Sequence, residues 1–330
     1  MKGIKLLGTG MYAPEKIVSN DDFAEIVETS DEWIYSRTGM RKRHLSQGEP
    51  TWYMAVKAGA MAIEKSGLMP DDIDMVILSS VTPDFLTPSM SCIIQRELGI
   101  KDCITLDINA ACSGFVYGFD MARRYLNFDD VKNVLVIGAE NLTKIIDYTD
   151  RSSCVLFGDG AGAAVVTASD DIYSSYINAD GNGAKHMVAR NFLPRNAFMP
   201  EDRKVYEDGL PEIQNSYLFM DGKEVYKFAI KALPLAVTEA CKKIDMPVEE
   251  IDVIIPHQAN IRIIETAAQR LGVSMDKVFT NIDKYGNTSS ASVPLALNEA
   301  MESGVIKKGD KVCLVGFGSG LTYGAVIFEA

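Results

Sequence analysis

Three short motifs of this 330-residue chain occur twice, in the same order and at a nearly constant distance. The matched residues are Ile73 and Ile251, Gly99 and Gly272, and Gly138 and Gly316, which lie 178, 173 and 178 residues apart. A regular self-similarity of this kind indicates a duplicated structural unit. We therefore expect two similar halves, residues 1–172 and 173–330.

Apolar runs of strand length alternate with helical segments in both halves. The expected strands are 74–78, 103–108, 134–137 and 252–255, and the expected helices are 88–98, 113–126 and 293–301. Continuous apolar strands between helices predict an α/β fold whose sheets are mainly parallel and covered on both faces. Residues 180–218 break the alternation, so we interpret them as a long insertion.

The charge and the cysteine pattern exclude several classes of protein. The net charge of −12 disfavours nonspecific nucleic-acid binding, which requires clustered Lys and Arg. No apolar run reaches the roughly 18 residues of a membrane span, and no signal peptide is evident, so we expect a cytoplasmic protein without membrane partners. The six cysteines form no CxxC pair and the three histidines are scattered, so no metal site is expected.

Cys112 is the first candidate for chemistry, because it lies between an expected strand and an expected helix. The free N–H groups and the dipole at a helix N-terminus favour a thiolate. The alternative is a buried structural cysteine in a strand–helix turn.

Two polar residues of the second half are further candidates. His257 follows the strand 252–255 and is expected to begin a helix, and Asn287 lies in a turn 175 residues after Cys112. The repeat places Asn287 and Cys112 in equivalent loops, which face one crevice at the carboxyl ends of the strands. Taken singly, each is more often structural: a histidine after a strand, an asparagine that forms a turn. The glycine-rich residues 317–320 are either an oxyanion donor or a tight turn.

These motifs together resemble the β-ketoacyl-acyl-carrier-protein synthase III family, the condensing enzymes that initiate fatty-acid synthesis. The matching segments are Thr29–Ile34 with Arg37–Gly39, Ala110–Gly114, Leu156–Gly162, His257–Asn260, Gly286–Ser289 and Phe317–Gly320. The resemblance implies a thiolase-like fold, with two βα halves in five αβαβα layers, and a homodimer.

The resemblance also implies a role for each matching residue. Cys112 is the acylated nucleophile, and His257 and Asn287 promote decarboxylation. The other roles it implies are an oxyanion hole (Cys112, Ser319), coenzyme A binding (Trp33, Arg37, Arg151, Gly222, Asn260), docking of the acyl carrier protein (Gln258, Arg262, Lys227) and an acyl pocket (Thr87, Phe317). No permanently bound cofactor or metal is implied.

The expected reaction is the decarboxylating condensation of an acyl-CoA with malonyl-acyl carrier protein. A His and Asn pair indicates the initiating branch, because elongating relatives use two histidines and neither His44 nor His186 lies in a comparable motif. The alternatives are a secondary-metabolite enzyme that makes a ketone, quinolone or ester, a Cys-His-Asn hydrolase, and an inactive scaffold. Thr87 stands where acetyl-preferring members carry Phe, which predicts a longer or branched acyl group, although the segment 180–218 could refill that space.

Overall fold

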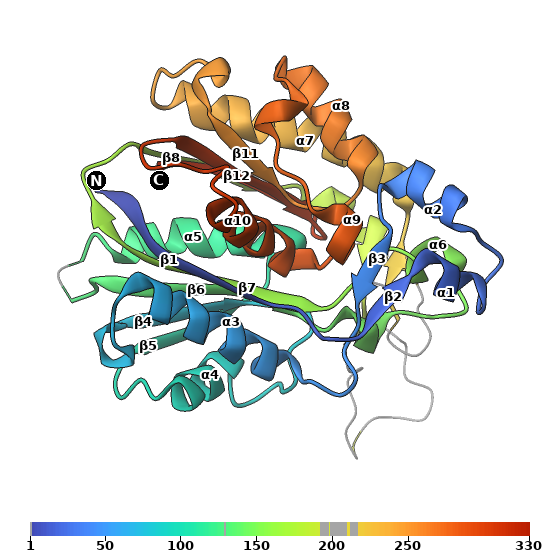
Figure 1. Cartoon of the computed structure of the whole chain (residues 1–330), viewed down its shortest axis with the longest axis horizontal. Coiled ribbons are helices and arrows are strands. Elements are labelled where there is room, and N and C mark those ends of the chain that lie inside the picture. The colour runs from blue at the N-terminus through green and yellow to red at the C-terminus, as the bar shows by residue number, and fades with distance from the viewer. Residues whose placement is uncertain (1, 129, 192–197, 199–209, 212–216) are drawn as a thin grey trace.

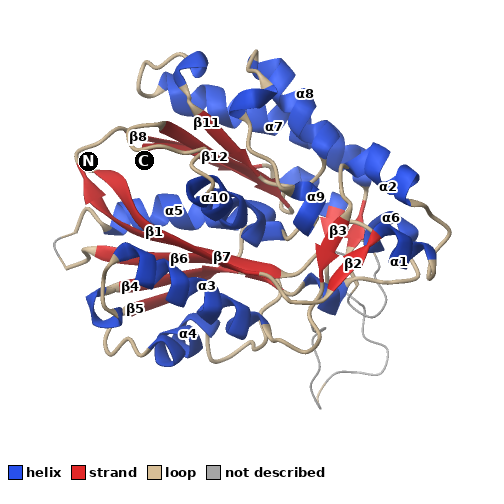
Figure 2. Ribbon diagram, viewed as in Figure 1, coloured by secondary structure: helices blue, strands red, loops and turns tan. Residues whose placement is uncertain are grey.

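The computed structural model describes residues 2–128, 130–191, 198, 210, 211 and 217–330. Its first large sheet has five strands in the order β1-β7-β6-β4-β5 (Figure 2). The strands are β1 (Gly3–Tyr12), β4 (Met75–Ser79), β5 (Ile104–Ile108), β6 (Asn133–Glu140) and β7 (Gly160–Ser169).

The second large sheet has four strands in the order β11-β12-β13-β8. They are β8 (Tyr173–Ala179), β11 (Val253–Pro256), β12 (Lys311–Gly318) and β13 (Thr322–Glu329). Read from β8, this order repeats the order β1-β7-β6-β4 of the first sheet. The position of β5 is taken by a single bridge between Ile254 and Val278, so the duplication is visible in the topology.

The expectation of mainly parallel sheets is wrong. β4 pairs in parallel with β5 and β6, and β11 with β12, but β7 and β13 run antiparallel to both of their neighbours. The physical reason is clearest in the second sheet, where β12 returns directly into β13. A connection as tight as residues 319–321 can join only antiparallel strands, because a parallel pair needs a long crossover.

Six helices cover the sheets in three layers (Figure 1). The outer pair on the first sheet is α3 (Thr51–Ser66) and α4 (Met90–Leu98), the central pair is α5 (Gly114–Tyr125) and α10 (Ser292–Glu302), and the outer pair on the second sheet is α7 (Gly222–Lys242) and α8 (Ile261–Leu271). The central pair contacts both sheets, so the layers alternate αβαβα. This confirms the predicted thiolase-like α/β fold.

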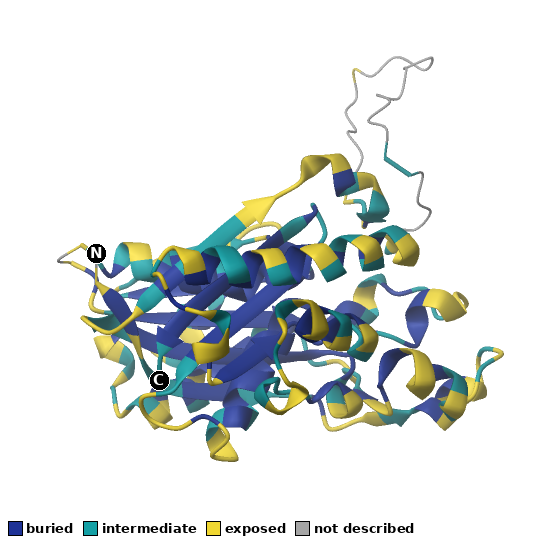
Figure 3. Cartoon of the chain, turned by 90° about the horizontal axis from the view of Figure 1, so that it is seen from above, coloured by how far each residue is buried: buried dark blue, intermediate teal, exposed yellow. Residues whose placement is uncertain are grey.

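The repeated glycines and the central apolar side chains show why the two halves fold alike and pack together. Gly99 ends α4 and Gly272 ends α8, both with φ of 73° and ψ of 20°, a left-handed conformation that glycine adopts without steric cost. Between the sheets, Phe119 of α5 packs on Phe328 of β13, with ring centroids 5.2 Å apart. Figure 3 shows this central region as buried. The two halves therefore share one hydrophobic core.

Short elements gather at one end of the layers, where α2, α9, β2 and β3 lie together (Figure 1). The short helices are α1 (Asn20–Ala24), α2 (Asp31–Thr38), α6 (Arg151–Cys154) and α9 (Ile282–Tyr285), and the short strands are β2 (Ile17–Ser19), β3 (Lys42–His44), β9 (Met187–Val188) and β10 (Phe219–Met220). No helix in the described residues combines the length and the apolar character that crossing a bilayer requires.

Candidate active site

The register of the strands brings several loops to one edge of each sheet. Ser79 at the end of β4 pairs with Ile108 at the end of β5 and with Gly138 of β6, which continues to Glu140. In the second sheet, Pro256 at the end of β11 pairs with Val315 of β12. The residues that follow these strand ends supply the polar groups described below.

Cys112 lies in the short 3-10 turn η2 (Ala111–Ser113), directly before α5. It is only 7% exposed and lies on the wall of a cavity of about 340 Å³. Gly318 of β12 packs against this turn: a Cβ at position 318 would lie 2.5 Å from the Cys112 nitrogen, so only glycine fits. The contact holds the turn that carries the sulfur against the second sheet.

The expectation that the helix end favours a thiolate is not met in the resting site. Burial raises the pKa of the Cys112 thiol to about 12; a hydrogen bond with the Ser289 side chain lowers it, and the nearby Glu140 carboxylate raises it again. Removal from water outweighs the helix end because burial penalises the charged form directly. At rest, Cys112 is a neutral thiol.

His257 lies between β11 and α8 rather than inside the helix. The helix begins at Ile261, and its N-cap is Asn260, whose side chain accepts a hydrogen bond from the Arg262 nitrogen at 2.9 Å. The His257 ring is 1% exposed and packs edge-on against Phe317 of β12, with ring centroids 5.4 Å apart. Burial lowers the pKa of His257 to about 3, so the imidazole is neutral.

The Ser292 hydroxyl selects the tautomer of this imidazole. Its oxygen lies 2.6 Å from His257 Nδ1 and accepts a hydrogen bond from the Gln258 nitrogen at 3.3 Å. We assign the single hydrogen of that hydroxyl to Nδ1, the arrangement in which the neutral imidazole presents its donor nitrogen, Nε2, to a substrate. His257 Nε2 then carries the ring proton.

Asn287 is held so that its amide group is a donor. Its Oδ1 accepts a hydrogen bond from the Ser289 nitrogen at 2.9 Å, and its backbone nitrogen donates to Leu156 at 2.9 Å. With the oxygen occupied, the NH₂ group is the end available to a substrate. The turn η7 (Ser289–Ala291), which follows Asn287, contacts η2, and η2 also contacts β12, against which His257 packs.

Four of the five residues expected to bind coenzyme A cluster at the end of the molecule near α2. The guanidinium groups of Arg37 and Arg151 lie over the Trp33 ring, 4.6 and 4.9 Å from its centroid. Asn260 donates a hydrogen bond to the Arg37 carbonyl at 3.0 Å. Gly222, the fifth residue, begins α7 and faces open space.

The residues expected to dock a carrier protein differ in their surroundings. Arg262 is exposed, and its guanidinium donates two hydrogen bonds to the Ser36 carbonyl at 3.1 and 2.8 Å. Lys227 is exposed and forms an ion pair with Glu224 at 2.6 Å. Both cations lie at the surface.

Gln258 does not fit a docking role, which corrects the sequence-based expectation. It is 1% exposed, donates to the Pro256 carbonyl at 2.7 Å and accepts from the Asn281 nitrogen at 3.1 Å. A glutamine whose two ends are both engaged in the interior cannot reach a protein partner. It joins the end of β11 to the start of α9.

The cavity walls contain only some of the predicted residues. Ser319 lies on the wall, and its hydroxyl donates to the Met187 carbonyl at 2.5 Å. Phe317 is buried against His257 instead, and the exposed Thr87 does not line the cavity of its own chain. The wall residues that the sequence did not reveal are Val81, Leu142, Ile145, Met187, Ala189 and Leu218.

The segment interpreted as an insertion contributes to this wall. Met187, Ala189 and Leu218 come from residues 180–218, where apolar side chains interleaved with polar ones were the available signal. Much of that segment, residues 192–197, 199–209 and 212–216, lies outside the described residues. The described residues contain no cluster of three or more His, Cys, Asp or Glu side chains able to hold a metal ion.

Comparison with known proteins agrees with this geometry. Residues 106–181 match the family described as 3-oxoacyl-[acyl-carrier-protein (ACP)] synthase III, and residues 241–330 match the C-terminal part of that family. A β-ketoacyl-[acyl-carrier-protein] synthase III of Caldanaerobacter subterraneus is 46% identical over 98% of this chain and 97% of its own. One from Clostridium perfringens is 44% identical over the whole of both chains.

A solved structure extends the likeness to three dimensions. The crystal structure of 3-oxoacyl-[acyl-carrier-protein] synthase III from Aquifex aeolicus superposes with a TM-score of 0.90 at 40% identity, and the match covers 99% of this chain and 100% of that one. Identity and coverage at this level exceed what a shared fold alone requires. The chain belongs to the 3-oxoacyl-[acyl-carrier-protein] synthase III family and is a ketoacyl synthase.

Proposed function

We propose that this enzyme condenses an acyl-CoA with malonyl-acyl carrier protein to give 3-oxoacyl-acyl carrier protein, CoA and CO₂, through an acyl group on Cys112. The observation that carries the proposal is the position of Cys112: a cysteine at the start of α5, on the wall of a largely apolar cavity, with the Asn287 turn beside it. The cavity suits an acyl chain, and the sulfur suits its thioester.

In the first half-reaction the Cys112 sulfur attacks the thioester carbonyl. A sulfur nucleophile suits this exchange, because a serine hydroxyl would require a stronger base. The backbone N–H groups of Cys112 and Ser319 stabilise the oxyanion, and the N-terminal end of α5 adds a favourable dipole. Coenzyme A leaves with a proton.

In the second half-reaction the malonyl thioester loses CO₂ and leaves an enolate. His257 Nε2–H and the Asn287 NH₂ group are two neutral donors for that oxygen. A neutral His257 imidazole is an advantage, because an imidazolium could protonate the carbanion before the carbanion attacks the acyl group. The lowered pKa of His257 supports this role.

The substrates reach the site through the cluster around Trp33. Arg37 and Arg151 provide positive charge for the phosphates of coenzyme A, and the exposed Arg262, one residue beyond the helix start, provides it for an acidic carrier protein. No permanently bound cofactor enters this scheme. The cytoplasmic location stays a prediction.

The proposed assembly is a homodimer formed at the free edge of the first sheet. β5 is an edge strand, and Ile104 on it is 42% exposed. The loop before α4 also exposes Phe85 and Leu86, which lie near Thr87 in sequence. An exposed edge strand beside apolar side chains is suited to pairing with a second copy.

Trapping of the acyl group tests the nucleophile. Intact-mass and peptide mass spectrometry after incubation with acyl-CoA should place the adduct on Cys112, and Cys112→Ser should abolish it together with condensation. Cys92, which is exposed, provides the control Cys92→Ser. An adduct confined to another cysteine, or release of free acid without condensation, would refute the assignment.

Separation of the half-reactions tests the donors. His257→Ala and Asn287→Ala should still become acylated but should lose malonyl decarboxylation by about 10²–10³-fold, the usual loss for one oxyanion donor. Normal decarboxylation by either variant would show that the residue does not stabilise the enolate.

A further inference from the structure

Glu140, the last residue of β6, is a fully buried carboxylate that the proposed mechanism leaves without a role. Its oxygens accept hydrogen bonds from the Val81 nitrogen (3.0 Å), Thr82 Oγ1 (2.7 Å), Ser80 Oγ (3.3 Å), Ser289 Oγ (3.0 Å) and Ser290 Oγ (2.7 Å). The Val81 N–H is a fixed donor and the four hydroxyls can donate or accept, while burial raises the pKa of the Glu140 carboxyl and so makes it a stronger base than an exposed glutamate. A buried charge stabilised by neutral donors alone is costly and is typical of functional sites.

Ser289 connects this carboxylate to the sulfur. Its hydroxyl donates to Glu140 Oε1 at 3.0 Å, it lies on the same cavity wall as Cys112 in a turn that contacts the Cys112 turn, and its side chain lowers the pKa of the Cys112 thiol. Because its hydrogen points at Glu140, its oxygen offers a lone pair to the Cys112 thiol. The backbone of Ser289 has φ of 51°, an unfavourable conformation for a residue with a side chain. The fold therefore holds Ser289 between Glu140 and Cys112 at a cost in backbone strain.

His257 does not supply the base that Cys112 needs. With the Ser292 hydroxyl assigned as donor to Nδ1, the nitrogen left for the substrate carries a proton. Direct ionisation is equally unsuited to the task. A thiol with a pKa of about 12 is ionised to roughly one part in 10⁵ at neutral pH.

We propose that Glu140 receives the proton of Cys112 through the Ser289 hydroxyl, a role that rests on the assignment of Cys112 as the nucleophile. The S–H bond of Cys112 breaks as the sulfur attacks the acyl carbon, and its proton passes to the Ser289 oxygen. The hydrogen already on that oxygen passes to Glu140 Oε1. The negative charge moves from carboxylate to sulfur, so no charge is added to the buried site.

The same path returns the proton. When the C–S bond to coenzyme A breaks, the departing thiolate accepts a hydrogen from Ser289, which recovers one from Glu140. The products are an acyl-Cys112 thioester, a neutral CoA thiol and the original carboxylate. Atoms and charge balance without an external base.

The surroundings of Glu140 accommodate both protonation states. Ser290 Oγ lies 2.7 Å from Glu140 and 3.0 Å from the Ser79 carbonyl oxygen. Its hydrogen can turn to Ser79 when Glu140 is protonated, which leaves its oxygen free to accept from the new O–H group.

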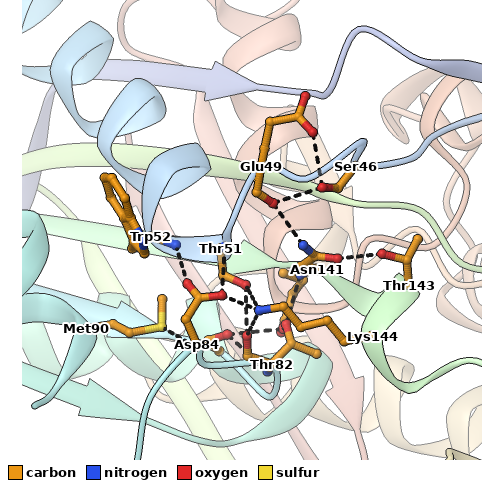
Figure 4. A network of polar contacts seen from close by, with 12 residues as sticks. Ser46, Glu49, Thr51, Trp52, Thr82, Asp84, Met90, Asn141, Thr143 and Lys144 are labelled. Carbon is orange, nitrogen blue, oxygen red and sulfur yellow. Dashed lines mark hydrogen bonds and ion pairs between the residues drawn. The ribbon is translucent and has the colours of Figure 1, made fainter. Parts of the chain in front are cut away.

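The charged groups near Glu140 contact its hydrogen-bond partners rather than Glu140 itself. Figure 4 shows Lys144, whose ammonium donates to the Thr82 carbonyl at 3.2 Å and pairs with Asp84. The hydrogen-bond partners of Glu140 itself are all neutral, and Cys112 is the ionisable group whose pKa it raises. The pH response of acylation therefore reports on the pair formed by Cys112 and Glu140.

The pH dependence of acylation in a single turnover with acyl-CoA tests the relay. The wild-type rate should become nearly constant with pH above the pKa of Glu140, which burial raises, because the base is internal. In Glu140→Gln, a nearly isosteric change that removes the charge and the basic oxygen, the rate should fall by about 10²–10⁴-fold at pH 7, as for a lost general base. It should then rise about tenfold for each pH unit, because the thiolate must form by loss of a proton to solvent.

Ser289→Ala keeps the Glu140 carboxylate but removes the hydroxyl that passes the proton, so its acylation rate should show the same steep dependence on pH. This variant replaces Glu140→Gln as the test if Glu140→Gln does not fold. Thr82→Val is the matched control: it removes one hydrogen bond to Glu140 and leaves the path, so the flat profile should persist. An acylation rate that does not change with pH in folded Glu140→Gln and Ser289→Ala would overturn the relay. The assignment of Cys112 as the nucleophile is tested separately, by the acyl adduct that mass spectrometry should find on Cys112 of the wild-type enzyme.

Discussion

At the scale of single residues, the site depends on how burial shifts protonation. The same loss of water lowers the pKa of His257 to about 3 and raises that of Cys112 to about 12. Both groups are neutral at rest, although for opposite reasons: burial disfavours the imidazolium in one and the thiolate in the other. Burial raises the pKa of Glu140 as well, so its carboxylate is a stronger base than an exposed glutamate and suits the proposed relay.

The lowered pKa of His257 predicts a pH profile for decarboxylation. An ordinary histidine gains a proton as pH falls through about 6.5, whereas His257 stays neutral until about pH 3. The rate of malonyl decarboxylation by the acylated enzyme should therefore be constant from about pH 8 down to pH 5. An acidic limb with an apparent pKa near 6.5 that moves or disappears in His257→Gln would show that the imidazole titrates normally.

At the scale of elements, α2 and α8 join the two halves beside the entrance. Arg262 of α8 donates to the Ser36 carbonyl of α2, and Asn260 donates to the Arg37 carbonyl. The carbonyls at the end of α2 are thus covered by side chains of the second half. The arginines over Trp33 and the arginine of α8 lie on neighbouring elements but have different expected partners.

Substitution of these arginines should affect the KM values of the two substrates separately. Arg37→Ala and Arg151→Ala should raise KM for acyl-CoA by about tenfold, the loss of one charge-assisted contact of about 1.4 kcal/mol. Arg262→Glu should raise KM for malonyl-carrier protein and change acylation little. The effects should shrink with added salt, which screens exposed charges within about 8–10 Å.

Equal losses with both substrates would point to a disturbed α2–α8 contact rather than to recognition. Lys242→Glu is a control for charge alone, because Lys242 pairs with Glu239 on the same helix, α7. That variant should alter neither KM.

The sequence predicted the positions of helices and strands better than it predicted strand direction and side-chain burial. Strands such as β4 and β6, and the helices after Cys112 and Asn287, follow from apolar runs and turn residues. The antiparallel direction of β7 was not predicted, because an apolar run carries no direction. Gln258 was misassigned because burial depends on contacts with Pro256 and Asn281, which the motif does not show. The sequence offered one indication that Glu140 is buried near the site: it is an acidic residue at the end of an apolar strand.

At the scale of the whole molecule, the core between the sheets makes one cooperative unit of the two halves. Phe119→Ala should lower the free energy of unfolding by about 3–5 kcal/mol, the usual cost of removing a buried aromatic ring. Thermal and urea unfolding should remain single transitions. Phe128, which is 63% exposed, gives the control Phe128→Ala, expected to change stability by less than about 0.5 kcal/mol. Two separate transitions in the Phe119 variant would show that the halves unfold independently.

The proposed dimer predicts which acyl groups the enzyme accepts. Thr87 is exposed on its own chain, so it is available to close the pocket of a second copy. A threonine there leaves room for a chain longer than acetyl, and each added buried CH₂ contributes about 0.8 kcal/mol. We expect kcat/KM to rise from acetyl- to butyryl- or isobutyryl-CoA, and Thr87→Phe to reverse that order. Strict acetyl preference in the parent enzyme would contradict the expectation.

The burial of the Cys112 thiol also bears on survival under oxidative stress. Peroxide attacks the thiolate and not the thiol, so a cysteine that is 7% exposed and whose thiol pKa is raised by burial is a poor target for overoxidation to sulfinic acid. Cys92, at the surface, is the sulfur that hydrogen peroxide meets first. An enzyme arranged in this way keeps its nucleophile reduced between turnovers and exposes its reactivity only to a thioester seated in the cavity.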